Sequence, residues 1–217
     1  MLKEWIEERD GCRFLVSDDC DDILILDEIF RDNTYRVSVR EGMTVLDIGA
    51  CKGIFATWAA RQGAKVTAYE ANPKTYGALL WNARENGITV DARNLGVWSS
   101  HTKMQLHPNR ANSGSSSFFR ELTNENTGRE VTVTMIPFDE AIGDKDWDVV
   151  KMDIEGSEFE ILSTSKKLGQ VAYLTAEIHI HNGFPGTELY ERTILNIDKT
   201  HDIELEGAMM YAKRRKN

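Results

Sequence analysis

The sequence contains few cysteines and no excess of basic residues. Three cysteines occur in 217 residues, Cys12, Cys20 and Cys51, with no CxxC pair. Because small secreted domains depend on paired cysteines, no disulfide framework is expected, and a reducing, cytoplasmic setting fits best. The 26 basic residues are outnumbered by 35 acidic ones, for a formal net charge of −9. Such a balance makes nucleic acid an unlikely partner.

Export and membrane signals are also missing. The first twelve residues, MLKEWIEERDGC, carry four acids and two bases, whereas a signal peptide has a basic start and then an apolar run. No stretch approaches the roughly 18 apolar residues of a membrane span. Hydrophobic residues at 41% and charged residues at 28% are ordinary for a globular protein. We therefore expect a soluble chain with no membrane partner and one main domain.

After residue 40, short β-rich runs alternate with helical patterns, as βαβ units on a parallel sheet do. The predicted strands are 44–48, 65–70, 89–94, 131–135, 148–153 and 174–180. The predicted helices are 53–62, capped by Gly63, 72–87, which begins at Asn72-Pro73, and 157–168. Residues 203–213 are interpreted as an antiparallel hairpin around Gly207, and 109–117 as a mobile surface loop, of which 112–117 could form a lid over the acceptor. We assign residues 1–40, with a short helix near 27–31, to an N-terminal cap and residues 41–217 to the main domain.

The most informative segment is VLDIGACKGIF, in which a strand enters a glycine turn and then a helix. Gly49 and Gly53 allow a ligand to approach the backbone, but their spacing is not the G-x-G-x-x-G that seats a pyrophosphate. Asp47 would repel a pyrophosphate and attract an ammonium. Glu70, at the end of the next strand, could accept hydrogen bonds from ribose hydroxyls.

These features favour a site for S-adenosyl-L-methionine, a nucleoside that bears an amino-acid group. The predicted cofactor-binding residues are Asp47, Gly49, Ala50, Gly53, Glu70, Ala71 and Asn94. In the other interpretation, Glu70 caps the following helix and the two glycines only allow close packing.

The segments VLDIGACKGIF, AYEANP, KMDIEGSEFEIL and AEIHIH resemble the FkbM-type family of S-adenosyl-methionine-dependent methyltransferases. The resemblance covers roughly residues 27–180. It implies a class I methyltransferase (Rossmann-like) α/β fold, with a mostly parallel seven-stranded sheet and the cofactor across the carboxyl ends of the strands. It also implies methyl transfer to hydroxyl groups of sugars, polyketides or similar molecules. Cys51-Lys52 replaces the Asn-Ile that is usual in the family, so a basic side chain is expected at the cofactor mouth.

A hydroxyl acceptor needs a base, or a metal ion, to remove its proton. The candidate catalytic residues lie at or just past the ends of predicted strands: Asp153, Glu155, Glu177 and His179, with His181 beside them. Strand alternation places Glu177, His179 and His181 on one face. Asp153, Glu177 and His179 are also candidate ligands for Mg²⁺ or Mn²⁺. The alternative is a half-solvated face, or carboxylates that only hold a helix N-terminus.

The leading hypothesis is O-methylation of a hydroxyl on a sugar or another small metabolite. The alternatives are an RNA methyltransferase, which the net charge disfavours, and a catalytically silent nucleoside-binding interaction protein. A dehydrogenase is disfavoured because the pyrophosphate fingerprint is missing.

Overall fold

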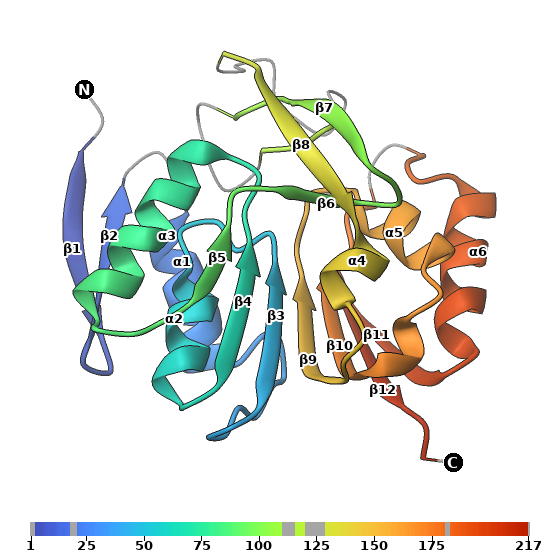
Figure 1. Ribbon diagram of the computed structural model, residues 1–217, viewed down its shortest axis with the longest axis horizontal. Helices are drawn as coiled ribbons and strands as arrows, with labels where there is room; N and C mark the ends of the chain where they lie inside the picture. The colour runs from blue at the N-terminus through green and yellow to red at the C-terminus, as the bar shows by residue number, and fades with distance from the viewer. Residues whose placement is uncertain (1–2, 18–20, 110–115, 120–128, 181–182, 217) are drawn as a thin grey trace.

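A seven-stranded sheet forms the centre of the protein (Figure 1). The structure, a computed structural model, describes residues 3–17, 21–109, 116–119, 129–180 and 183–216. In sheet order the strands are β11 (His201–Glu206), β12 (Met209–Arg214), β10 (Val171–Glu177), β9 (Trp147–Met152), β3 (Thr44–Ile48), β4 (Lys65–Tyr69) and β5 (Asp91–Arg93). The five strands from β10 to β5 are parallel, and β12 runs antiparallel to both of its neighbours. The predicted mostly parallel sheet with a C-terminal hairpin is therefore confirmed.

The glycine and proline signals set the helix boundaries near the sheet. Helix α2 (Ile54–Arg61) begins after Gly53 and is followed by Gly63, both with positive φ. Helix α3 (Pro73–Glu85) starts with Pro73, and the Asn72 side chain accepts a hydrogen bond from the Lys74 N–H. Helix α5 (Glu158–Thr164) is shorter than predicted, and a 3₁₀ turn (Leu168–Gln170) follows it.

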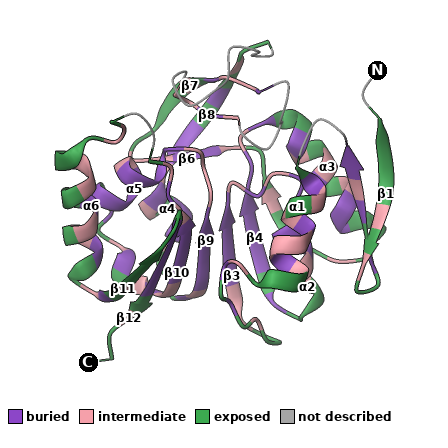
Figure 2. Ribbon diagram, turned by 180° about the vertical axis from the view of Figure 1, so that it is seen from behind, coloured by how far each residue is buried: buried purple, intermediate pink, exposed green. Residues whose placement is uncertain are grey.

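Helices cover both faces of the sheet, whose inner strands are buried (Figure 2). Val45 and Val149 face one cluster, which includes residues of α2, of α1 (Asp22–Asp27) and of the π-helical turn Glu28–Asp32. Leu46 and Val150 face the other, which includes residues of α4 (Phe138–Ile142), α5 and α6 (Thr187–Asp198). Neighbouring strand residues therefore serve opposite layers, as strand alternation requires. None of the helices in the described ranges has the length and apolar character of a bilayer-spanning segment.

The N-terminal residues share the core of the sheet. Strands β1 (Glu4–Arg9) and β2 (Cys12–Ser17) form an antiparallel hairpin, which the sequence did not predict, beside α3. Phe14 and Leu26 belong to the same buried cluster as Phe55 of α2. The expected short helix near 27–31 corresponds to α1 and the π-helical turn. The boundary at residue 40 stays a prediction.

One predicted strand lies in a different place. β8 (Val131–Pro137) is not part of the parallel sheet but pairs with β6 (Gly96–Trp98) and β7 (Thr102–Leu106) in a three-stranded sheet. Val133 and Met135 are buried while Thr132 and Thr134 are exposed, so only one face is covered over 132–135; Ile136, near the end of the strand, is buried on the other face. This second sheet lies above the carboxyl ends of the parallel strands (Figure 1). Of the predicted loop 109–117, residues 110–115 lie outside the described part of the chain.

Candidate functional site

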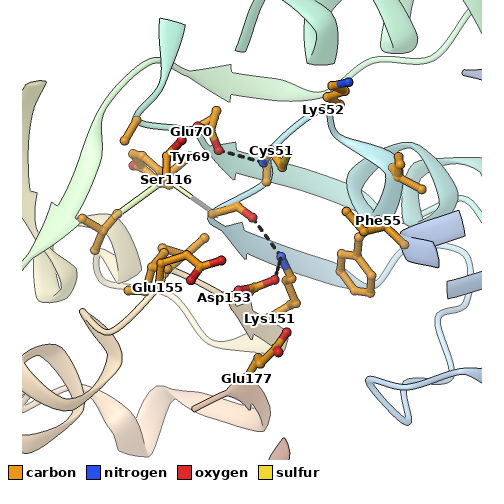
Figure 3. A pocket seen from close by; sticks show the side chains of 18 of the residues that line it. Cys51, Lys52, Phe55, Tyr69, Glu70, Ser116, Lys151, Asp153, Glu155 and Glu177 are labelled. Carbon is orange, nitrogen blue, oxygen red and sulfur yellow. Dashed lines mark hydrogen bonds and ion pairs between the residues drawn. The ribbon is translucent and has the colours of Figure 1, made fainter. Parts of the chain in front are cut away.

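A cavity of about 250 Å³ lies at the carboxyl ends of β3, β4, β9 and β10. Its wall combines the glycine turn after β3, the strand ends, residues of α1 and residues next to the second sheet (Figure 3). This position at the strand ends is where open α/β sheets bind ligands. Its volume is just below the roughly 300–1,000 Å³ usual for small-molecule sites.

The glycine turn is shaped by close backbone contacts. A Cβ on Gly49 would lie 1.8 Å from the Asp153 carbonyl oxygen, and one on Gly53 would lie 2.6 Å from Leu79. The N–H groups of Gly49 and Ala50 both donate to the Tyr69 carbonyl, each at 3.0 Å. Cys51 takes a left-handed conformation, with φ of 50°, which is uncommon for a residue other than glycine. The protein itself therefore holds the turn in its shape.

Glu70 connects this turn to the start of α3. Its carboxylate accepts a hydrogen bond from the Cys51 N–H at 2.7 Å (Figure 3). It also accepts hydrogen bonds from the Asn72 N–H and the Thr75 hydroxyl at 2.8 Å each. The side chain lines the cavity although the residue is only 8% exposed. Burial raises the pKa of Glu70, and these hydrogen bonds act in the opposite direction. Glu70 thus makes the contacts expected if it caps helix α3, and it also has the cavity position expected if it binds the ribose of the cofactor.

The other predicted cofactor residues differ in position. Ala50 and Ala71 line the cavity with Gly49. Asn94 does not line it. Its side-chain amide donates to the carbonyl oxygens of Glu70 at 2.8 Å and Ala71 at 3.1 Å, and so fastens the loop after β4.

Asp47 lies behind the cavity rather than in its wall. It is fully buried, and β3 and β9 place it beside Lys151 in register. The Lys151 ammonium lies 3.3 Å from the Asp47 carboxylate, donates to the Gly49 carbonyl at 2.9 Å and lies 3.9 Å from Asp153. The ammonium that faces Asp47 is therefore the protein's own. Sequence reasoning did not select Lys151, although a lysine within a buried apolar strand is a rare feature.

Three candidate catalytic carboxylates, Asp153, Glu155 and Glu177, line the cavity (Figure 3). The Tyr35 hydroxyl donates to Asp153 at 3.3 Å. Burial raises the pKa of Glu155 to about 8 and, together with the charge of Asp153, the pKa of Glu177 to about 7. The Glu177 carboxylate makes no hydrogen bond or ion pair with any residue that the structure describes. It can therefore exchange a proton near neutral pH.

His179 lies between two carboxylates. Its Nδ1 is 3.2 Å from Glu158 and its Nε2 is 3.2 Å from Glu155. Burial opposes the charged imidazolium, but the hydrogen bond and charge of Glu158 outweigh it and raise the pKa of His179 to about 10. Glu158 also accepts the N–H groups of Ile154 at 2.9 Å and Gly156 at 2.8 Å. This cluster fixes the loop that presents Asp153 and Glu155.

The predicted metal ligands come together, but their chemistry does not fit a divalent cation. Single ligand atoms of Asp153, Glu177 and His179 lie within 4.8 Å of one another. A metal needs a neutral imidazole nitrogen with a free lone pair, whereas both nitrogens of His179 lie 3.2 Å from carboxylates of Glu155 and Glu158. We therefore derive no step through Mg²⁺ or Mn²⁺. His181 lies outside the described residues.

Lys52 is directed away from the expected cofactor mouth (Figure 3). Its backbone belongs to the glycine turn, but its ammonium, which is buried, lies 2.6 Å from Asp22 and binds the Ser17 hydroxyl. The basic group that distinguishes this turn therefore ties it to the N-terminal segment.

Comparisons with known proteins agree with this geometry. The family model described as Methyltransferase FkbM domain matches residues 47–203. A curated relative, the ubiquinone biosynthesis O-methyltransferase of Agrobacterium fabrum, is 42% identical over 53 residues, which cover 24% of this chain and 21% of the relative. The match thus spans about a fifth of that relative's length.

Solved structures share the fold at low sequence identity. A putative rRNA methylase from Clostridium thermocellum has a TM-score of 0.50 at 12% identity, with 91% of this chain and 97% of that chain covered. A 16S rRNA methyltransferase from T. thermophilus has a TM-score of 0.51 at 12% identity, with 99% of this chain and 51% of that chain covered. The family match, the sheet topology and the cavity at the strand ends together place the chain in the FkbM family of S-adenosyl-L-methionine-dependent methyltransferases, with their class I, Rossmann-like fold.

Proposed function

We propose that this methyltransferase transfers the methyl group of S-adenosyl-L-methionine to a hydroxyl on a sugar or another small metabolite in the cytoplasm. The observation that carries the proposal is the set of cavity carboxylates, above all Glu177, with its pKa of about 7. General bases work best when their pKa lies near the operating pH. A hydroxyl acceptor requires such a base.

The residues on the cofactor side fit a nucleoside. A carboxylate offers about four acceptor positions, and Glu70 uses three of them for the protein. Among the residues that the structure describes, Oε2 accepts a hydrogen bond only from the Cys51 N–H and retains capacity for a ribose hydroxyl. Ala50, Ala71 and Gly49 supply a wall of backbone and small side chains beside it. When bound, the cofactor supplies an electrophilic methyl group on a sulfonium.

On the acceptor side, Glu177 takes the proton of the acceptor hydroxyl onto its carboxylate. Asp153, held by Tyr35 and Lys151, orients the hydroxyl. His179 stays protonated and holds Glu155 and Glu158, so its role is orientation rather than proton removal.

Charge supports a small acceptor over RNA. Asp21 and Glu28 add to the acids that line the cavity, while the two lysines there, Lys52 and Lys151, are paired with buried aspartates. An acidic wall repels phosphates, which dominate the affinity of nucleic-acid binders. The short match to the A. fabrum O-methyltransferase is in keeping with a hydroxyl acceptor.

The test is incubation of the protein with methyl-labelled S-adenosyl-L-methionine and an extract of its source cell, followed by identification of the labelled product. The Glu177→Gln variant controls for transfer by other enzymes, and Glu204→Gln on the exposed strand β11 is the matched change away from the cavity. Label in a glycan or small metabolite, lost with Glu177→Gln and kept with Glu204→Gln, supports the proposal. Label in RNA contradicts it, and cofactor binding without any transfer indicates the silent binding protein instead.

A further inference from the structure

We propose that Lys151 is a positioning residue that holds the cofactor turn and Asp153 in a fixed relation to each other. On the acceptor side this inference rests on the proposed function, since Asp153 is assigned there to the acceptor. On the cofactor side it rests only on the contacts of the Lys151 ammonium and on the family's cofactor.

The ammonium lies where three segments meet. It donates to the Gly49 carbonyl at 2.9 Å and lies 3.9 Å from Asp153 after β9 (Figure 3). It also lies 3.3 Å from Asp47 of β3. An ammonium carries three N–H donors, so a single lysine can serve all three oxygens. The Tyr35 ring lies 5.3 Å from the same nitrogen.

Both charged groups are buried, so each must be paired with an opposite charge. Lys151 is 4% exposed and Asp47 is fully buried, so each is the charge partner that the other needs inside the protein. Burial alone would lower the pKa of Lys151, but the charges of Asp47 and Asp153 outweigh it and raise that pKa. Lys151 therefore stays protonated and is not the base that receives the acceptor proton.

The two segments that Lys151 joins, the glycine turn after β3 and the loop after β9, are also in direct contact. The Asp153 N–H donates to the Ile48 carbonyl at 3.0 Å, and the missing Cβ of Gly49 leaves room for the Asp153 carbonyl. With its carbonyl bound to Lys151, Gly49 cannot rotate its peptide group away. On the other side, Lys151 and the Tyr35 hydroxyl approach the same oxygen of Asp153. The Lys151 side chain thus positions both Gly49 on the cofactor side of the cavity and Asp153 on the acceptor side.

The experiment separates this role from the stability of the buried charge pair. Three variants are compared with the native protein: D47N, D47N/K151M and K151R. The double variant removes both charges, so no uncompensated charge remains in the core. The probe is S-adenosyl-L-homocysteine, titrated by calorimetry, with thermal unfolding as the measure of folding.

D47N, which keeps Lys151, is expected to bind the probe within about threefold of the native protein. D47N/K151M is expected to bind at least about tenfold more weakly than D47N, as the loss of a charge-assisted hydrogen bond predicts, with a Tm at or above that of D47N because no unpaired lysine charge remains. Equal affinity of D47N and D47N/K151M would overturn the inference. If the double variant does not fold, the K151R variant provides the test, because arginine keeps the positive charge but not the geometry of the ammonium. Binding of the probe at least about tenfold weaker than in the native protein supports the positioning role, and native affinity overturns it.

The proposed function can fail independently. If the native protein transfers no label to any hydroxylated metabolite, the acceptor assignment is wrong, but the titration still decides whether Lys151 positions the cofactor turn. If transfer occurs and the titration shows no effect of K151M in the D47N background, the inference fails and the proposed function stands.

Discussion

We predict that the buried ion pair between Lys52 and Asp22 stabilises the packing of the N-terminal segment on the methyltransferase core. Lys52 follows Cys51 in the glycine turn, and Asp22 begins helix α1. Their charged atoms lie 2.6 Å apart, with side-chain exposures of 6% and 1%. The perturbation is Lys52→Met, which keeps an unbranched side chain and removes the charge.

The expected loss of stability in K52M depends on the contacts that Asp22 keeps. Asp22 keeps its hydrogen bond from the Ser17 N–H at 2.8 Å but loses its cation in a site that water does not reach. Removing one partner of a buried pair costs about 3–5 kcal/mol. For a chain of this size, 1 kcal/mol corresponds to about 2–4 °C in Tm, so K52M is expected to unfold about 6–20 °C below the native protein.

Differential scanning calorimetry measures this loss. The double variant D22N/K52M removes both charges of this pair, so its Tm should recover above that of K52M. The matched control is Arg31→Met, which breaks the exposed i,i+4 pair with Asp27 and should leave Tm within the error of measurement. The reasoning is refuted if K52M unfolds within about 3 °C of the native protein, or if D22N/K52M is less stable than K52M.

Four further outcomes concern the cavity. Glu70→Gln should weaken S-adenosyl-L-homocysteine binding by about 1–3 kcal/mol in a calorimetric titration. Thr75→Val, which removes the hydroxyl that donates to Glu70 and to the Asn72 carbonyl in the first turn of α3, should not weaken it. Glu177→Gln should slow label transfer by about 10²–10⁴-fold with little change in the affinity for S-adenosyl-L-homocysteine. The rate of label transfer by the native protein should rise with pH through about 7, as Glu177 loses its proton. Thermal stability should fall between pH 6 and pH 8, because Glu155 and Glu177 hold protons in the native state that their unfolded forms release; a Tm that rises over this range would contradict the raised pKa values. Transfer should continue in excess chelator, because His179 is held as a cation, and a loss that added Mg²⁺ or Mn²⁺ restores would contradict this.

The main sheet could be predicted because its signals are local. The run from Thr44 to Ile48 is apolar apart from its polar first residue and Asp47, and Gly53, Gly63 and Asn72-Pro73 mark helix ends by backbone conformation alone. The β1–β2 hairpin was missed because the residues of its first strand, EWIEER, are mostly charged. Helix α6 lies in a part of the sequence to which no element was assigned. The strand at β8 was recognised, but its sheet was not, since pairing partners depend on contacts that are distant in sequence.

For the site, the residues that reach the strand ends could be predicted from the sequence alone: Glu70, Asp153 and Glu177 all line the cavity. These positions follow from strand length and alternation, which are local properties. Only the tertiary structure decided which groups they face. It buries Asp47 against Lys151, directs Lys52 to Asp22 and places His179 between Glu155 and Glu158. A charge in the core is stable only beside its partner, and which partner it finds depends on segments that come together only in the folded chain.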